Sequence, residues 1–147
     1  MTNFSLYLLA AGAGLAIVVQ QALNAKVRVE LDSALWAAVV SYVGGTVAVV
    51  AALLIAREPL VSGAAIARTP WYAWAGGFFG AVFICLSILL LPRLGAATVI
   101  ALVVVGQMLG SLAFDHFGVL GLPVQEATPM RLAGAALLIA GVVLIRF

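Results

Sequence analysis

The feature that most constrains this chain is a pair of long apolar runs, residues 71–91 and 95–114, joined only by Pro92-Arg93-Leu94. Each run has about the 20 residues that an α-helix needs to cross the roughly 30 Å hydrocarbon core of a bilayer. The second run ends abruptly at Asp115-His116. This arrangement predicts a transmembrane helical hairpin with a polar exit.

The rest of the chain has the same apolar character. Hydrophobic residues make up 66% of the 147 residues and charged residues only 8%, whereas a soluble domain is about half apolar and a quarter charged. We therefore predict an all-α integral membrane protein with one membrane domain and no second, soluble domain. The five predicted transmembrane helices are residues 4–24, 34–56, 71–91, 95–114 and 130–147.

Two helix boundaries depend on charged residues. Lys26 to Asp32 alternates charged with apolar residues, which predicts a solvated connector, after which Asp32 or Ser33 caps the second helix. The fifth span has only 14 uninterrupted apolar residues between Arg131 and Arg146, a length that also fits a non-spanning segment. We favour a span, because both arginines can extend toward opposite membrane surfaces.

The few reactive side chains argue against several classes of function. With one cysteine, Cys85, and one histidine, His116, the chain cannot form an internal disulfide, a cysteine metal cluster or a multi-histidine site. Since the sequence also offers no nucleophile–base pair, we predict no enzyme activity, no metal and no cofactor. The seven basic residues are scattered near predicted helix ends, which argues against a nucleic-acid partner.

Polar residues inside the spans are the candidate substrate ligands. Gln20 and Asn24 are four residues apart and share one face of the first helix. The fourth helix has polar residues at every fourth position, Gln107, Ser111 and Asp115, and the three together turn only about 80° around its axis. The alternative is that these groups form interhelical hydrogen bonds that only fix packing, worth about 1 kcal/mol each.

Residues at the membrane edges also have two interpretations. Asp115 and His116 are candidates for coupling transport to an ion, or they form a solvated helix end. Trp74 is a candidate for lining a substrate vestibule, or it anchors the third span together with Trp71 at headgroup depth. No ionisable residue lies in the middle of a span, where coupling groups are usually sought.

Four motifs carry a family resemblance over essentially the whole chain. They are Gly12-x-Gly14, Gln20-Gln21-x-Leu23-Asn24, Pro92 to Gly95, and the run from Gly106 through Gln107, Ser111 and Asp115-His116 to Gly118. Together they resemble the YdcZ-type family of the drug/metabolite transporter superfamily. The resemblance implies a five-helix half-transporter in the inner membrane, working as an antiparallel homodimer or beside a homologous partner, like one half of the ten-helix members.

One departure from related transporters limits the expected mechanism. The small multidrug resistance relatives have a membrane-embedded glutamate in their first helix. The corresponding region here, Ala10 to Val19, contains no carboxylate. We therefore do not expect proton-coupled export of lipophilic cations by that mechanism.

The charge distribution bears on orientation. With five spans, Arg57, Arg68 and Arg131 lie on one side of the membrane, and four basic residues lie on the other: Lys26, Arg28, Arg93 and Arg146. Three against four is a weak bias under the positive-inside rule. Such a balance permits insertion in both orientations, and the alternative is one weakly preferred orientation.

The predicted function is that of a secondary transporter subunit in the inner membrane, which moves a small polar or amphipathic metabolite by alternating access. We expect its site to combine Gln20 and Asn24 of one protomer with Gln107 and Ser111 of an inverted mate. The alternative is a non-transporting scaffold or accessory subunit. The expected partners are the lipid bilayer, a small-molecule substrate and a second copy or homologue.

Overall fold

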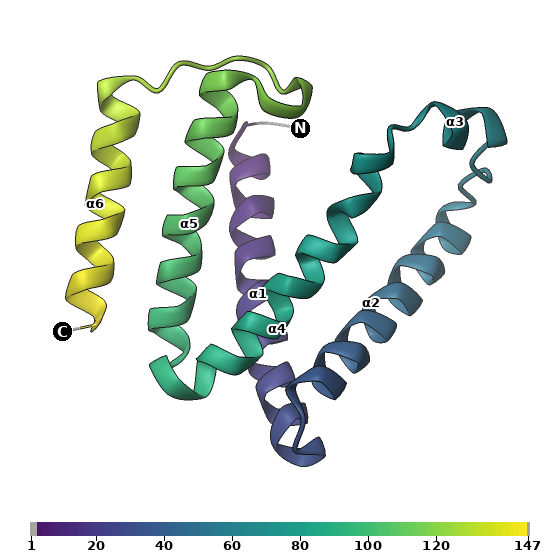
Figure 1. The fold of residues 1–147 in the computed structure, drawn as a ribbon, viewed down its shortest axis with the longest axis horizontal. Helices are drawn as coiled ribbons and strands as arrows, with labels where there is room; N and C mark the ends of the chain where they lie inside the picture. Colours follow the sequence, from purple (N-terminus) through teal and green to yellow (C-terminus); the bar gives the residue numbers. More distant parts are fainter. Residues whose placement is uncertain (1–2, 147) are drawn as a thin grey trace. The chain divides into compact units, whose positions relative to one another are not determined.

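The computed structural model describes residues 3–146, so Met1, Thr2 and the last residue of the predicted fifth span, Phe147, lie outside the described residues. This part of the chain is helical without strands, and five of its helical segments are long and apolar enough to cross a membrane (Figure 1). The predicted all-α membrane class is therefore confirmed. The five segments are α1 (Asn3–Leu31), α2 (Ala34–Ala56), η1 with α4 (Trp71–Ala75 and Gly76–Leu94), α5 (Ala96–Phe117) and α6 (Pro129–Arg146).

The chain divides into two compact units, residues 1–93 and 94–147. The first contains α1, α2, the short helix α3 (Gly63–Arg68), η1 and α4, and the second contains α5, the 3₁₀ turn η2 (Val119–Gly121) and α6. Each unit is described by itself below. The single membrane domain expected from the sequence stays a prediction.

Helix α1 continues seven residues beyond its predicted end and includes most of the expected connector. Lys26 and Glu30 lie four residues apart on the helix, and their side chains form an exposed ion pair with Nζ and Oε1 3.1 Å apart. Such i,i+4 pairs favour helix, which explains why the charged segment does not leave the helical conformation. The chain turns only at Asp32, which has a φ of 47°.

Helix α2 has capping groups at both ends. The Ser33 hydroxyl accepts a hydrogen bond from the Trp36 amide at 3.2 Å, so of the two predicted caps it is Ser33 that satisfies a free amide of the first turn. At the other end Arg57 adopts the left-handed conformation, and its amide donates to the Leu54 carbonyl at 3.2 Å. Helix α2 thus starts and stops through local hydrogen bonds.

The core of the first unit is small and lies between α2 and α4. Ala37 and Ala38 of α2 are buried with Ile84 and Ile88 of α4. Tyr42 packs on this cluster and donates from its hydroxyl to the Gly77 carbonyl at 3.4 Å. Side-chain contacts thus hold α2 against α4, although the two helices are far apart in sequence.

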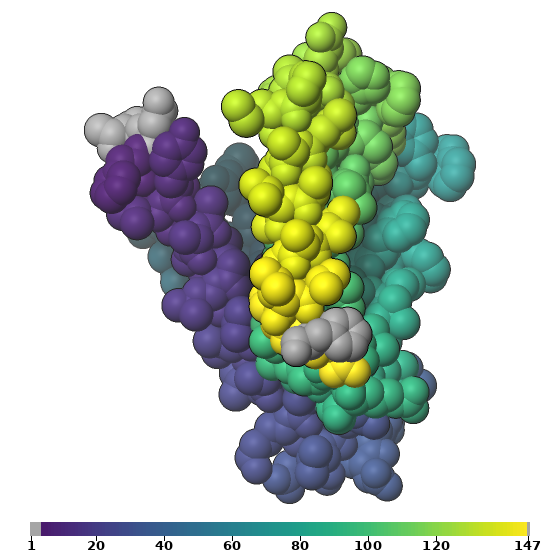
Figure 2. Space-filling model, turned by 90° about the vertical axis from the view of Figure 1, so that its left-hand side faces the viewer, coloured from purple at the N-terminus to yellow at the C-terminus, as the bar shows by residue number. Residues whose placement is uncertain are grey.

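The link between α4 and α5 differs from the predicted tripeptide turn. Helix α4 runs through Pro92 and ends at Leu94, and the direction changes at Gly95, which has a φ of 80°. Glycine adopts this conformation without the steric cost that a Cβ would bring. In the second unit α6 lies along α5 (Figure 2), and the connector after Gly118, where the φ of 59° ends α5, joins them.

Candidate functional site

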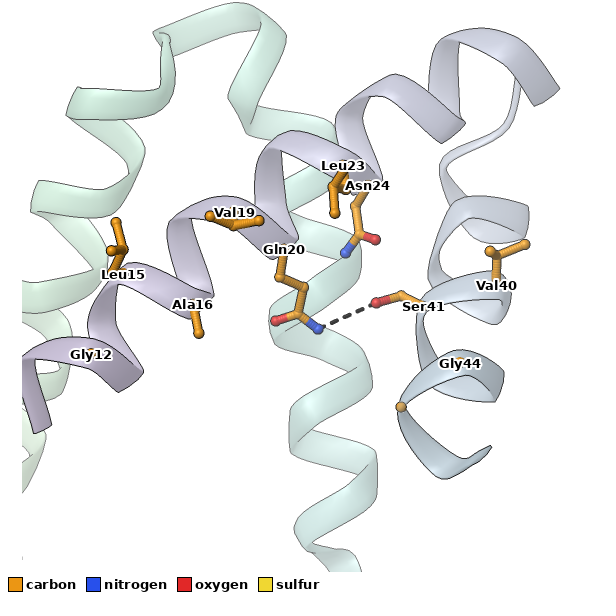
Figure 3. A pocket seen from close by; sticks show the side chains of 11 residues that line it. Gly12, Leu15, Ala16, Val19, Gln20, Leu23, Asn24, Val40, Ser41 and Gly44 are labelled. Carbon is orange, nitrogen blue, oxygen red and sulfur yellow. Dashed lines mark hydrogen bonds between the residues drawn. The ribbon is translucent and has the colours of Figure 1, made fainter. Parts of the chain in front are cut away.

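A hydrogen bond between two polar side chains joins α1 to α2 in the middle of apolar sequence. The Gln20 Nε2 group donates to the Ser41 hydroxyl oxygen at 3.3 Å (Figure 3). Gln20 lies 11 residues before the end of α1, further from the helix end than the predicted boundary implied. Both groups are therefore placed well inside their helices, where a lipid environment offers no other polar partner.

This pair lies in a groove of about 620 Å³ between α1 and α2. Figure 3 shows the Gln20 side chain directed from α1 toward α2, with Asn24 one turn further along α1. The groove is apolar apart from these amides and the hydroxyl. Its wall consists of Gly12, Leu15, Ala16, Val19, Gln20, Leu23 and Asn24 from α1, and Val40, Ser41, Gly44 and Gly45 from α2.

A second groove of about 470 Å³ shares Gln20, Ser41 and Gly45 with the first. It extends along α2 and reaches Ile84 of α4. The Gln20–Ser41 hydrogen bond thus borders both grooves. A small solute with one or two hydrogen-bonding groups and an apolar body matches such a lining, because binding sites combine apolar walls with a few placed polar groups.

Next to Gln20, two amides of α1 are withdrawn into the chain. Asn24 is 7% exposed and Gln21 is 5% exposed. Neither the oxygen nor the nitrogen of the Gln21 side chain has a hydrogen-bond partner. The sequence predicts Gln20 and Asn24 as site residues but does not single out Gln21 or Ser41. A signal for Gln21 exists, because it is three residues before Asn24 and so shares its helix face.

In the second unit Gln107 and Ser111 lie at the surface of α5. Gln107 is 11 residues after the start of the helix and 10 before its end. Neither side chain makes a hydrogen bond to the described part of the chain, and Gly106 and Gly110 beside them have no atom close to where a Cβ would lie. This polar and glycine-rich face of α5 is open.

Asp115 and His116, the candidate coupling residues, hold the connector between α5 and α6. The Asp115 carboxylate pairs with the Arg131 guanidinium at 2.5 Å, and both side chains are partly buried. The Asp115 carbonyl accepts from the Gln125 amide at 2.8 Å, and His116 Nδ1 accepts from the Ala127 amide at 3.3 Å. Arg131, which the sequence predicts only as a charge flanking the fifth span, is thus the partner of Asp115.

Arg131 also bonds to the connector itself. Its Nη1 donates to the carbonyls of Gln125 and Glu126 at 3.3 and 3.4 Å. One guanidinium therefore joins the start of α6 to the end of α5 and to the loop between them. Arg131 can do this because its planar fork offers several donors at once.

Trp74 lies in η1, the 3₁₀ turn that precedes α4, and is 62% exposed. Its neighbours Trp71 and Tyr72 meet edge to face with ring centroids 6.1 Å apart. None of the grooves described above includes Trp74 in its wall. This position is compatible with both interpretations of Trp74, anchoring at the membrane interface and lining a substrate vestibule.

Two comparisons with known proteins agree with one another. Residues 5–144 match the family described as "Putative inner membrane exporter, YdcZ". The chain is also 32% identical over 135 residues to the "Inner membrane protein YdcZ" of Escherichia coli (strain K12), an overlap covering 92% of this chain and 89% of that protein. The chain belongs to the YdcZ family. No solved structure matches it.

Membership of the YdcZ family confirms the predicted resemblance and, with the five spans, makes this a multi-pass protein of the inner membrane. A family described as an exporter points to a membrane transporter rather than to an enzyme. Among residues 3–146, no group of three or more His, Cys, Asp and Glu side chains is arranged to hold a metal ion. The remaining question is how the grooves of this chain serve transport.

Proposed function

We propose that the protein is a subunit of a secondary transporter that moves a small polar or amphipathic metabolite across the inner membrane by alternating access. The description of its family as an exporter supports the outward direction. The observation that carries the proposal is the Gln20–Ser41 hydrogen bond bordering two grooves. An amide and a hydroxyl that pair only with each other can exchange that bond for bonds to a solute.

The proposed substrate class follows from the chemistry of the grooves. Their walls supply hydrogen-bonding groups from Gln20, Asn24 and Ser41, with the hydroxyls of Tyr42 and Thr46 added in the second groove, but no charged side chain. A fully charged solute would lose its hydration without gaining an opposite charge, which is costly in low dielectric. A neutral or amphipathic solute avoids that cost. Trp74 is retained as a proposed contact at the entrance from the membrane surface.

The proposed working unit is a pair of chains inserted in opposite orientations. The side chains of Gln107 and Ser111 of α5 have no hydrogen-bond partner within the described chain. The glycines beside them, Gly106 and Gly110, have free space around them. We propose that Gln107 and Ser111 of one protomer complete the groove of an inverted mate, which contributes Gln20 and Asn24. A second copy or a homologous partner would serve equally, because the family resemblance implies both arrangements.

Asp115 and His116 remain the proposed coupling residues. Any ion coupling at this point requires the Asp115–Arg131 pair to open, because the carboxylate is already engaged. Opening it would also release the loop that Arg131 and His116 hold. Coupling would then appear as a change in the α5–α6 connector.

The test is solute flux into proteoliposomes, screened with a panel of labelled neutral and amphipathic metabolites. Once a transported solute is found, Gln20→Ala should reduce its flux at least about tenfold. The variant leaves the polar group of the bound solute without its hydrogen-bond partner in an apolar groove. Gln107→Ala should do the same. Gln125→Ala is the matched control, because only the backbone of this loop glutamine bonds within the chain.

Three results would contradict the proposal. Unchanged flux in Gln107→Ala removes that residue from the site, and unchanged flux in Gln20→Ala removes the groove. No flux for any solute in a broad panel, with the folded protein confirmed in the vesicles, would favour a scaffold or accessory subunit instead.

A further inference from the structure

Helix α4 contains a proline in its last turn, and this leaves a backbone carbonyl without its usual partner. In an α-helix the carbonyl of Ile88 would accept a hydrogen bond from the amide four residues later. That residue is Pro92, which has no N–H. The helix nevertheless continues to Leu94.

An arginine from another helix fills the vacant position. Arg28 Nη1 of α1 donates to the Ile88 carbonyl oxygen at 3.2 Å, across 60 residues of sequence. The hydrogen bond is partly buried, and Ile88 is only 2% exposed. Because a buried carbonyl without a partner is costly in an apolar medium, the guanidinium replaces what the proline removed.

The bond differs from a helical one in a way that matters for motion. A side-chain donor can leave a carbonyl by rotating its own bonds, whereas a backbone amide can leave only if the helix unwinds. Proline also weakens the local helix by its clash with the preceding turn, so helices bend at such points. The boundary between the two compact units falls directly afterwards, between Arg93 and Leu94.

We propose that Arg28, Ile88 and Pro92 form a hinge with a lock: Pro92 lets α4 bend, and the Arg28 guanidinium on the Ile88 carbonyl holds one bend angle. When Arg28 is bound, α1 is tied to the turn of α4 that precedes Pro92. When it is released, the segment after Pro92 is free to change direction. The hinge does not depend on the proposed transport function.

A double-mutant cycle isolates the lock. In purified protein unfolded reversibly with detergent, Arg28→Ala should raise the unfolding equilibrium constant by about tenfold, because the Ile88 carbonyl is left unpaired. In a Pro92→Ala background residue 92 supplies an N–H to the same carbonyl. There Arg28→Ala should change the constant by less than about twofold.

Arg93→Ala is the matched control, since it removes the same charge from an exposed position one residue after the proline. It should have the same small effect in both backgrounds. If Arg28→Ala alone does not fold, the double variant Arg28→Ala/Pro92→Ala should restore folding. Equal effects of Arg28→Ala in both backgrounds, or no rescue, overturn the lock.

Spin labels test the hinge itself. In a Cys85→Ser background, labels at Leu54 of α2 and Leu137 of α6, both 74% exposed, report the distance between points in the two units. Arg28→Ala should broaden the distance distribution, and adding Pro92→Ala should narrow it again. A distribution that Arg28→Ala leaves unchanged overturns the hinge.

Discussion

Two neighbouring glutamines of α1 have opposite surroundings, although the sequence presents them as equivalents. Successive helical residues point about 100° apart, so Gln20 reaches Ser41 in the groove while Gln21 is 5% exposed and has no partner for either amide atom. Gln20 is available to a solute. Gln21 is buried without a compensating hydrogen bond, so its amide should lower the stability of the first unit.

Replacing Gln21 with leucine should therefore stabilise the protein. An apolar side chain of similar size removes the desolvation cost of an unpaired amide, so the free energy of unfolding should rise by about 1–2 kcal/mol. Reversible unfolding with detergent measures it. Gln20→Leu is the control and should lower that free energy, because it leaves the Ser41 hydroxyl alone. A lower stability for Gln21→Leu would mean that the amide has a partner, such as an internal water.

At this scale the sequence identifies the polar residues but not their partners. Gln20 and Asn24 stand out because amides are rare in an apolar span and must be hydrogen-bonded somewhere. That Gln20 bonds to Ser41 depends on how α2 is rotated about its axis. The packing of Ala37, Ala38 and Tyr42 against α4 sets that rotation, and these are contacts between helices far apart in sequence.

Among the elements, the spans are predictable and their ends are not. Apolar length alone identifies five crossings, because the bilayer sets the number of residues each one needs. The alternating charges after Asn24 predict a solvated loop there, and this prediction is wrong. The helix instead uses those charges, with Lys26 paired to Glu30 and Arg28 directed to α4. In a short segment, hydrophobic periodicity and residue polarity do not distinguish a charged helix end from a solvated loop.

The contact between α2 and α4 can be tested at Gly80. A Cβ there would clash with the Tyr42 hydroxyl, while the ring carbon Cζ would lie at an ordinary 3.6 Å. Gly80→Ala should therefore displace the hydroxyl from the Gly77 carbonyl and lower the free energy of unfolding by about 1 kcal/mol. The measurement is again reversible unfolding.

Tyr42→Phe supplies the control for this prediction. Without the hydroxyl there is neither a clash nor a hydrogen bond to lose, so Gly80→Ala should cost almost nothing in the phenylalanine background. Gly76→Ala, where a Cβ meets no atom within 4 Å, should be mild in both backgrounds. A cost at Gly80 that persists in the Tyr42→Phe background would place the strain in the helix backbones instead.

For the whole molecule the question is how many orientations one chain adopts. The proposed inverted pair needs both, and the sequence permits both because basic residues are nearly balanced between the two sides. The structure shows where three of these basic residues lie. Lys26 and Arg28, which the sequence predicts in a loop, lie on the last turns of α1, and Arg131 is paired with Asp115. All three are still near span ends, where the positive-inside bias acts, so the number of basic residues on the two sides stays close to even.

Labelling of single cysteines decides between one orientation and two. Leu60, which is 99% exposed in the connector after α2, and Leu31, at the end of α1, are separated by one span and lie on opposite sides of the membrane in any one orientation. In a Cys85→Ser background, an impermeant maleimide applied to spheroplasts should label about half of the protein at each position if insertion is dual. Complete labelling at one position and none at the other, with both labelled after permeabilisation, would rule out the inverted homodimer. The inverted mate would then have to be a homologous chain with the opposite charge bias, which is the remaining way for Gln107 and Ser111 to meet a groove like the one around Gln20.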